Sequence, residues 1–291
     1  MLAEKKNFSV SRMARLLGVS RSGFYAWMKR GPSKRQTRNE DLAAKITKSH
    51  ADSDGVYGAP RVLIDLRESG EVVSRKTVAR IMADLGLQGV FPKRFKVTTL
   101  RDNADTYPED LALRAWDKGE VNKLWIGDIT YLRTWEGWLY LAVVMDAHSR
   151  RVIGWAIDET MTADLVEDAL KMAKTMRDDL PVKVVFHSDK GTQYASNQIR
   201  KWTGDNGIVR SMGATGVAWD NAMAESFFAT LKTEHYYRHV WATKKQARQS
   251  VGRWIEEVYN RRRRHSALGQ IDPVTYEMRQ LNHHPKDQQA A

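Results

Sequence analysis

The sequence predicts a mixed α/β domain that follows two small helical units and precedes a helical segment. Residues 120–236 alternate between strand-like and helix-like hydrophobic patterns, whereas the first 95 residues hold two helical pairs. Between them, a basic and then an acidic stretch is broken by Pro108, which is typical of a linker. The predicted divisions are residues 1–48, 49–95, a linker at 96–119, 120–236 and 237–291.

Charge is distributed unevenly along the 291 residues, whose formal net charge is +12. Residues 1–100 sum to +11, residues 101–230 to −5 and residues 231–291 to +6. A basic chain favours a polyanionic partner, either nucleic acid or an anionic membrane surface. An acidic middle between basic ends suits a carboxylate metal site whose flanks bind phosphates.

The composition also excludes several classes of protein. The chain has no cysteine, so disulfides, thiolate metal sites and a cysteine nucleophile are ruled out. No signal peptide is recognisable at the N-terminus, and the longest apolar run, Leu139–Met145, is too short to span a bilayer. We therefore expect no membrane partner and a cytoplasmic location.

The first helical pair is predicted at residues 9–29. Gly18 marks the turn, and Ser20 can cap the second helix, which begins with the candidate DNA-binding residue Arg21. This layout is that of a helix-turn-helix, although any helical hairpin with a glycine between its helices reads the same way. The predicted apolar stripe of the first helix comprises Met13, Leu16 and Leu17.

A second helical pair follows residues 31–50, which we interpret as a polar linker leading into a helix. Pro60 stands in the first turn of one helix, and Ser74 caps the next, which Gly86 ends. Helical spacing turns Val78, Ile81, Met82 and Leu85 inward. It leaves Arg75, Lys76 and Arg80 outside, either to contact DNA or as an ordinary solvated basic face.

The order of elements in residues 120–236 indicates the fold of this domain. Three strand-like runs precede an alternation of helix and strand, so the order is β-β-β-α-β-α-β-α, the ribonuclease-H-like arrangement. The predicted strands are Trp125–Arg133, Trp138–Asp146, Val152–Ile157, Val182–Phe186 and Ile208–Ser211. The predicted helices are residues 162–178, 195–206 and 220–235.

Three acidic residues occupy distinct positions in this domain. Asp128 lies within a strand, Asp189 directly follows an apolar strand, and Glu225 lies on a helix after 35 intervening residues. Hard oxygen ligands select Mg²⁺ or Mn²⁺. Two such ions roughly 3.5–4 Å apart can activate a nucleophile and stabilise the leaving oxygen of a phosphodiester. Each acid taken alone would be an ordinary turn residue or a member of a solvated pair.

Further candidates lie near the acids and near the C-terminus. Lys232 is seven positions after Glu225 and shares its helix face, where it would contact a phosphate. Asn221, one turn before Glu225, would orient that carboxylate or contact substrate. Trp254, Ile255 and Tyr259 predict a helix docked on the core. A basic run follows this helix and would contact bound DNA, although such a run is ordinarily just a solvated patch. The run comprises Arg261, Arg262, Arg263 and Arg264.

Several segments together resemble a known family. The core resembles the DDE catalytic domain, the integrase-type core shared by retroviral integrases and bacterial transposases. The whole chain resembles the OrfB frame of the IS-three group of insertion-sequence transposases. The segments concerned are Val19–Tyr25, Tyr57–Arg61, Trp125–Leu132, His187–Tyr194, Trp219–Lys232, Tyr259–Asn260 and Arg264–Gly269.

This resemblance implies that Asp128, Asp189 and Glu225 form the metal-binding catalytic triad. It further implies recognition of terminal inverted repeats, strand cleavage and joining through a circular intermediate. The implied partners are double-stranded DNA, further copies of this chain in a homo-oligomer of at least two, and an upstream-frame (OrfA) partner or fusion. The implied location is the cytoplasm, in association with a bacterial nucleoid. Two other functions stay open: a helix-turn-helix regulator with a silent core, and a ribonuclease-H-like nuclease that cuts without joining.

Overall fold

The computed structural model describes residues 1–91, 119–178, 183–213 and 222–283. The chain divides into two compact units, Met1–Gly89 and Val90–Ala291. No helix in these described residues combines the length and the apolar character needed to cross a membrane.

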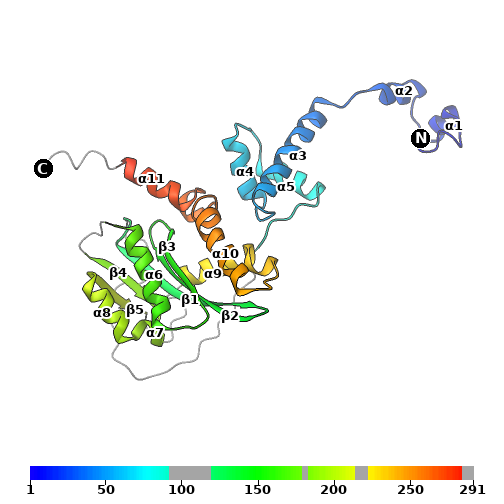
Figure 1. Ribbon diagram of the computed structural model, residues 1–291. Helices are drawn as coiled ribbons and strands as arrows, with labels where there is room; N and C mark the ends of the chain where they lie inside the picture. The colour runs from blue at the N-terminus through cyan, green and yellow to red at the C-terminus, as the bar shows by residue number, and fades with distance from the viewer. Residues whose placement is uncertain (92–118, 179–182, 214–221, 284–291) are drawn as a thin grey trace. The chain divides into compact units, whose positions relative to one another are not determined.

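Five helices make up the first unit (Figure 1). They are α1 (Val10–Leu16), α2 (Arg21–Lys29), α3 (Lys34–Asp52), α4 (Ala59–Glu68) and α5 (Arg75–Asp84). Serines cap four of them, because each hydroxyl accepts a hydrogen bond from a backbone amide three residues on, as Ser20 does from Gly23. Both predicted helical pairs are therefore present, as α1–α2 and α4–α5.

Helix α3 starts earlier than the sequence predicts, at Lys34 where a linker was expected. Ser33 caps it, and its buried Leu42 and Ile46 lie one turn apart, so α3 packs with α4 and α5. The helix consequently runs through residue 48, the predicted boundary between the two helical domains. The predicted inward positions of Leu16, Leu17 and Leu85 are wrong, since all three are exposed; Met13 and Ala14 are the buried residues of α1.

A five-stranded sheet of order β3-β2-β1-β4-β5 forms the centre of the second unit. Its strands are β1 (Leu124–Thr134), β2 (Gly137–Asp146), β3 (Val152–Asp158), β4 (Val184–Ser188) and β5 (Ile208–Met212). The first three pair antiparallel, and β4 pairs parallel with both β1 and β5. This mixed sheet confirms the predicted α/β, ribonuclease-H-like class.

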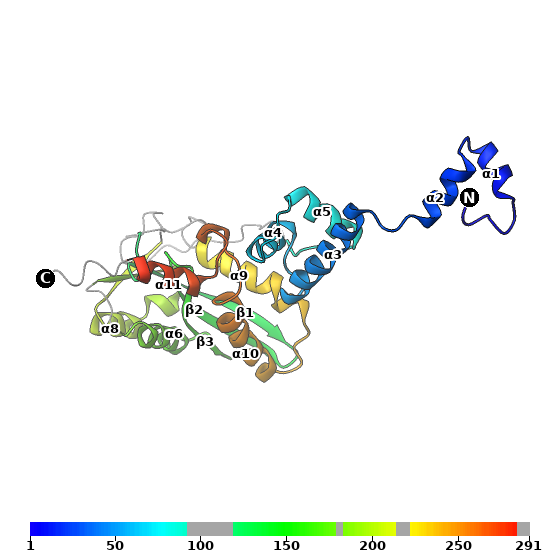
Figure 2. The ribbon, with the colours of Figure 1, turned by 90° about the horizontal axis from the view of Figure 1, so that it is seen from above.

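Helices cover both faces of this sheet (Figures 1 and 2). One face packs against α6 (Ala163–Met176), α7 (Thr192–Ala195) and α8 (Asn197–Asp205), and the other against α9 (Ala222–Glu234) and α10 (Lys244–Arg253). Alternate residues of β1 separate the two cores, since Trp125 faces α6 whereas Ile126 faces α9. Gly154 lets α6 approach, because a Cβ atom there would lie 2.1 Å from the Ala169 carbonyl oxygen.

The C-terminal segment covers the edge of the sheet at β3. A π-helical turn (Trp254–Tyr259) follows α10, and Trp254, Ile255 and Tyr259 are buried, which confirms the predicted docked helix. The buried Asn260 side chain then bonds both main-chain groups of Val152: its Oδ1 accepts from the amide at 3.0 Å, and its Nδ2 donates to the carbonyl at 2.9 Å. Short 3₁₀ turns, η1 (Tyr236–Arg238) and η3 (Ser266–Leu268), and α11 (Pro273–His283) complete the unit.

Candidate functional site

Strand pairing brings two of the predicted acids to the same edge of the sheet. In the parallel pair of β1 and β4, Ile126 stands opposite His187. Asp128 is two residues after Ile126, and Asp189 is two residues after His187. The two acids are therefore at the same height along the two parallel chain segments. Carboxyl ends of parallel strands are where α/β sheets bind ligands.

Close packing beside Asp128 depends on Gly127. A Cβ atom at this position would lie 2.4 Å from the Phe186 ring and 3.4 Å from the Tyr194 ring. Glycine therefore lets both rings pack directly against the β1 backbone. As a result, Tyr194 from α7 lies next to the strand that carries Asp128.

Helix α9 supplies the third acid and the lysine. Its buried residues Phe227, Phe228 and Leu231 belong to the core that also contains Ile126 and Leu132 of β1. Glu225 and Lys232, seven residues apart, are half-buried on this helix. The helix is thus fixed on the sheet face from which Asp128 is reached.

Electrostatic coupling links these four residues. The pKa of Asp128 is raised to about 8, chiefly by burial and also by the charges of Asp189 and Glu225, while a hydrogen bond from the Ile129 amide and the charge of Lys232 partly oppose the change. Burial likewise raises the pKa of Glu225. Asp189 is exposed, yet loss of water around its carboxyl raises its pKa, opposed by the Gly191 amide, which donates a hydrogen bond at 3.0 Å.

Tyr194 adds a polar group that sequence reasoning missed. Its hydroxyl is buried and has no hydrogen-bond partner among the described residues. Burial, together with the charges of Asp128 and Asp189, raises the pKa of this phenol far above its usual range. The one signal for it in the sequence is its place five residues after Asp189, because nothing in the local pattern shows that its ring turns towards β1.

The donor chemistry of the site fits a hard divalent cation. Three coupled carboxylates and a phenol offer only oxygen atoms, as Mg²⁺ and Mn²⁺ prefer, and a cation would offset the repulsion that raises the pKa of Asp128. As they stand, however, the side chains of the described residues form no group of three or more His, Asp or Glu that could hold a metal ion. The acids must therefore move closer together for all three to bind one.

Two neighbouring residues complete the account of the predicted site. Asn221 lies outside the described residues, so its expected role remains a prediction. His187 is fully buried and its Nδ1 lies 2.9 Å from the Ser211 hydroxyl, which is the environment of a structural histidine.

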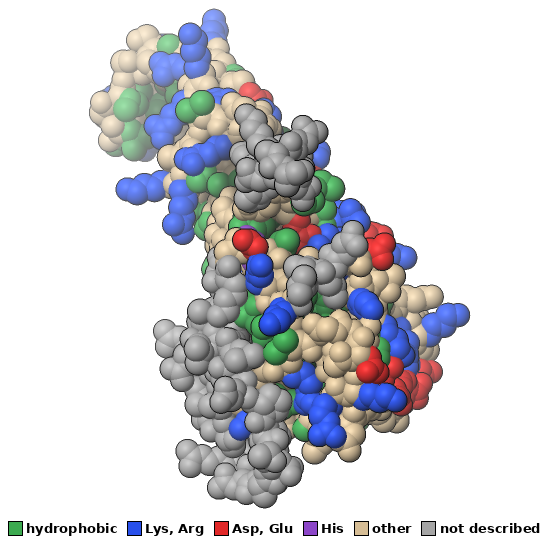
Figure 3. Space-filling view, turned by 90° about the vertical axis from the view of Figure 1, so that its left-hand side faces the viewer, with side chains coloured by type: hydrophobic (Ala, Val, Ile, Leu, Met, Phe, Trp, Pro, Cys, Tyr) green, Lys and Arg blue, Asp and Glu red, His purple; other side chains and the backbone are tan. Residues whose placement is uncertain are grey.

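The basic residues predicted to bind DNA in the first unit lie on its surface. Arg21 begins α2, and Arg75, Lys76 and Arg80 lie on the exposed side of α5, where Arg80 forms a 3.0 Å ion pair with Asp84. Lys and Arg side chains outnumber Asp and Glu on the N-terminal helices in the face drawn in Figure 3. This surface is compatible with a phosphate backbone, and the DNA contacts remain predictions.

The four arginines at 261–264 fall into two groups. Arg261 and Arg262 are exposed. In contrast, Arg263 donates two hydrogen bonds of 2.7 Å to Glu234, and Arg264 donates to the Gln270 carbonyl at 2.8 Å. The second pair therefore helps to hold the C-terminal segment together, and Arg261 and Arg262 are the better candidates for DNA contact.

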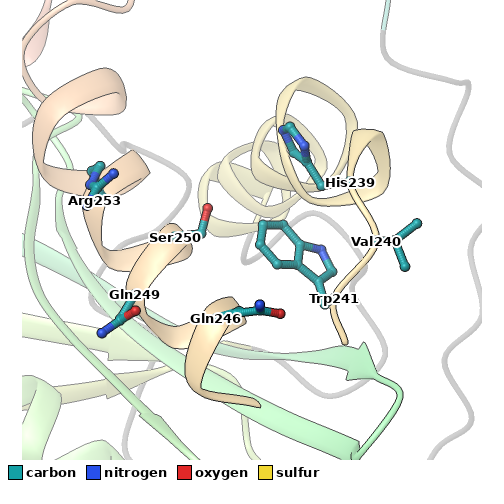
Figure 4. Close-up of a pocket in the computed structure, with 7 residues that line it drawn as sticks. All are labelled: His239, Val240, Trp241, Gln246, Gln249, Ser250 and Arg253. Carbon is teal, nitrogen blue, oxygen red and sulfur yellow. The ribbon is translucent and has the colours of Figure 1, made fainter. Parts of the chain in front are cut away.

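A separate pocket of about 420 Å³ lies between α10 and the segment after η1 (Figure 4). Trp241, His239 and Val240 form one wall, and residues of α10, among them Arg253, form the other. None of the described residues that line it carries a carboxylate. It is therefore distinct from the acid site.

Comparison with known families and relatives agrees with this architecture. Two models described as integrase core domain match residues 119–218 and 206–273, and one described as HTH-like domain matches residues 37–95. The chain is 39% identical over 276 residues to the transposase InsF for insertion sequence IS3A of Escherichia coli, covering 94% of this chain and 96% of that protein. It is 36% identical over 264 residues to a putative transposase for IS986/IS6110 of Mycobacterium tuberculosis, covering 89% and 95%.

Solved structures of integrases are also similar, at low identity. The catalytic core domain of BIV integrase matches with a TM-score of 0.40 and 19% identity, over 56% of this chain and 97% of that one. The HTLV-2 integrase catalytic core domain, in complex with magnesium, matches with a TM-score of 0.32 and 19% identity, over 38% and 67%.

Proposed function

Because this chain belongs to the IS3 family of insertion-sequence transposases, which serve DNA transposition, we propose that it cuts and joins DNA with Asp128, Asp189 and Glu225. The observation that carries the proposal is that Asp189 and Glu225 are close enough to the buried Asp128 for their charges, after burial itself, to raise its pKa. Such coupling is costly without a cation, and strongly perturbed acids cluster at functional sites.

The three carboxylates would hold two Mg²⁺ or Mn²⁺ ions. Bound there, the ions would activate a water or a 3′-hydroxyl and stabilise the leaving oxygen of the phosphodiester. Asp128 and Asp189 each follow, by two residues, the last pair of β1 with β4, whereas Glu225 lies on α9. The rigid strands would thus orient two ligands, and the helix would bring the third.

Lys232 would bind a phosphate of the DNA beside the acids. Burial lowers the pKa of its ammonium, and the charge of Asp128 opposes that change. An ammonium beside three carboxylates is suited to neutralise a phosphate oxygen rather than to remove a proton. Its role is therefore to position the DNA strand.

The helical unit would recognise the terminal inverted repeats of the element. Its exposed basic residues on α2 and α5 supply phosphate contacts, and its helical pairs suit insertion into a major groove. At least two copies would pair two DNA ends, with an upstream-frame partner or fusion as a further component.

The decisive experiment compares single variants of the full chain. Purified protein is incubated with Mg²⁺ and random DNA fragments, and the broken ends are sequenced; an added target DNA then reports joining. Asp128→Asn, Asp189→Asn and Glu225→Gln should each abolish cleavage while DNA binding persists. Asp168→Asn is the matched control, because this acid is exposed on α6 and lies 3.4 Å from Lys171.

Full cleavage by any one of the three variants would contradict the triad. Cleavage without joined product would instead favour a nuclease, and binding without cleavage by the unaltered chain would favour a regulator.

A further inference from the structure

Two exposed aromatic rings lie on the β1–β2 hairpin, on the side of β1 opposite to Asp128, and Lys232, whose charge acts on Asp128, reaches one of them. Tyr131, three residues after Asp128, is 60% exposed, and Trp138 on β2 is 42% exposed. Their ring centroids lie 5.4 Å apart with an interplanar angle of 87°. Large aromatic side chains are usually well buried, so an exposed pair held edge to face marks a surface available for binding.

Each ring has a cationic side chain over its face, in a cation–π contact. The Lys232 Nζ lies 5.0 Å from the Tyr131 ring centroid, and the Arg133 guanidinium lies 5.3 Å from that of Trp138. Arg133 stands directly opposite Trp138 in the strand register. Rings and positive charges therefore alternate over a short distance, as in surfaces that bind single-stranded nucleic acid.

The strand arrangement explains why these rings remain uncovered. Beside β1, strand β4 pairs only with Leu124–Ile126, so the rest of β1 has β2 as its neighbour among the described strands. Beyond Asp128, Thr130, Leu132 and Thr134 are buried, whereas Tyr131 and Arg133 alternate with them and are exposed. The rings are thus displayed by a rigid hairpin rather than by a loop.

We propose that Tyr131 and Trp138, with Lys232 and Arg133, form a subsite for an unpaired DNA base beside the acid site. Trp138 stacks on the base, Tyr131, whose ring is perpendicular to it, contacts the edge of the base, and the cations contact the flanking phosphates. A base within a duplex is stacked on both faces, so the rings can engage only one that has left the helix. The inference rests on the proposed function, because it assumes that DNA ends reach the carboxylates.

The test compares two DNA probes that differ at one end. One duplex is fully paired, and the other is splayed by terminal mismatches that carry fluorescent aminopurine in an unpaired position. The label is put in the DNA because the chain contains 10 tryptophans. Wild type should prefer the splayed duplex and quench its aminopurine. Trp138→Ala should weaken binding of the splayed duplex by about 5- to 150-fold and leave the paired duplex unaffected.

Matched variants separate stacking from loss of structure. Trp138→Phe retains a ring and should keep most of the preference for the splayed duplex. Trp135→Ala should change nothing, since Trp135 is 77% exposed on the same hairpin and its backbone amide, not its ring, bonds the Trp241 carbonyl. Circular dichroism and light scattering accompany each measurement, so that unfolding or a change in oligomeric state is detected.

Three results would overturn the subsite: no preference in the wild type, equal losses on both probes, or a Trp138→Ala variant that alters oligomeric state instead of base quenching. The second result would indicate a duplex contact, and the third a surface for a second copy. Mg²⁺-dependent cleavage is measured in parallel. A wild type that cleaves but lacks the preference refutes the subsite alone, whereas splayed-end binding without cleavage refutes the proposed function.

Discussion

The second unit contains two clusters of charged side chains with opposite electrostatic character. Around Glu277 of α11, burial alone would raise its pKa, but bonds from Arg177, Ser149 and Arg151 outweigh burial and lower it. Arg151 Nη1 donates a hydrogen bond to Oε2 of Glu277 at 2.6 Å, and Arg177 Nη1 donates to the same oxygen at 3.1 Å. In the acid site, by contrast, burial and the charges of Asp189 and Glu225 raise the pKa of Asp128, and the Ile129 amide and Lys232 oppose them only in part.

This difference distinguishes a structural cluster from the cluster that we propose to be functional. A buried carboxylate with two guanidinium partners has its charge balanced in the fold as it stands, so removing it would leave both arginines uncompensated. A group of coupled carboxylates with raised pKa values is instead stabilised when a cation binds. The two clusters should therefore respond oppositely to neutralisation of their acids, which the following variants examine.

Glu277→Gln should have the largest effect on stability. It would leave Arg151 and Arg177 partly buried without a countercharge, so we expect a loss of about 3–5 kcal/mol in the free energy of unfolding. Urea denaturation measures it. Glu257→Gln is the control, since that acid is exposed and 3.7 Å from Arg262, and it should change little. Similar stability of the two variants would mean that the α11 cluster is not structural.

Asp128→Asn should change how stability depends on pH. The pKa of Asp128 is raised from 3.8 to about 8 in the fold, so the native state binds the proton more tightly and wild-type stability falls as pH rises between these values. The variant lacks this loss, which is at most about 1.4 kcal/mol per pH unit for one proton. In denaturation experiments without metal, the variant should become more stable relative to the wild type as the pH rises to about 8, and the difference in unfolding free energy should then stay constant.

Added Mg²⁺ should reduce that difference by stabilising the ionised acids of the wild type. A difference that stays constant across the pH range would contradict the raised pKa, and an equal effect of Mg²⁺ on both proteins would contradict metal binding at Asp128.

Two arginines of one run should behave differently. Arg263→Gln breaks a doubly bonded, largely buried pair with Glu234 and should cost about 2 kcal/mol or more of stability. Arg261→Gln should leave stability unchanged but lower the salt dependence of DNA binding by about one unit in log–log slope. Thermal denaturation and binding at several salt concentrations measure both. A loss of stability in Arg261→Gln together with a lower salt dependence in Arg263→Gln would mean that Arg261 is the structural residue and Arg263 the one that contacts DNA.

The smallest effect concerns two tyrosine hydroxyls. Without metal, Tyr194→Phe should raise stability by about 1 kcal/mol, because it removes a buried hydroxyl that lacks a partner among the described residues. Tyr236→Phe is the matched variant and should lose about 1 kcal/mol, since its hydroxyl donates to the Arg133 carbonyl at 3.0 Å. Differential scanning calorimetry of the pair distinguishes them, and losses in both would mean that Tyr194 already has a partner.

Much of the fold is readable from the sequence because its signals are local. The strands of the central sheet stand where aromatic and β-branched runs predict them, within about two residues at each end of most strands. Ser20 and Ser74 cap the helices expected of them. The order of these elements then suffices to predict the sheet, since few topologies accommodate it.

What the sequence misses depends on contacts between distant residues. Nothing near Arg263 reveals that Glu234, 29 residues earlier, will bind it. Nor does the pattern around Tyr194 show that Gly127 leaves room for its ring. Helix α3 was expected to start later because its first residues are polar, and its cap at Ser33 together with packing on α4 and α5 overrides that bias.

The Asn260 amide has a consequence for incomplete chains. By bonding both main-chain groups of Val152, it occupies positions that another β-strand would otherwise fill at the margin of the sheet. A polypeptide ending before residue 260 would present those groups bare, which is a template for aggregation. A prematurely terminated chain should thus aggregate rather than form a smaller, monomeric domain.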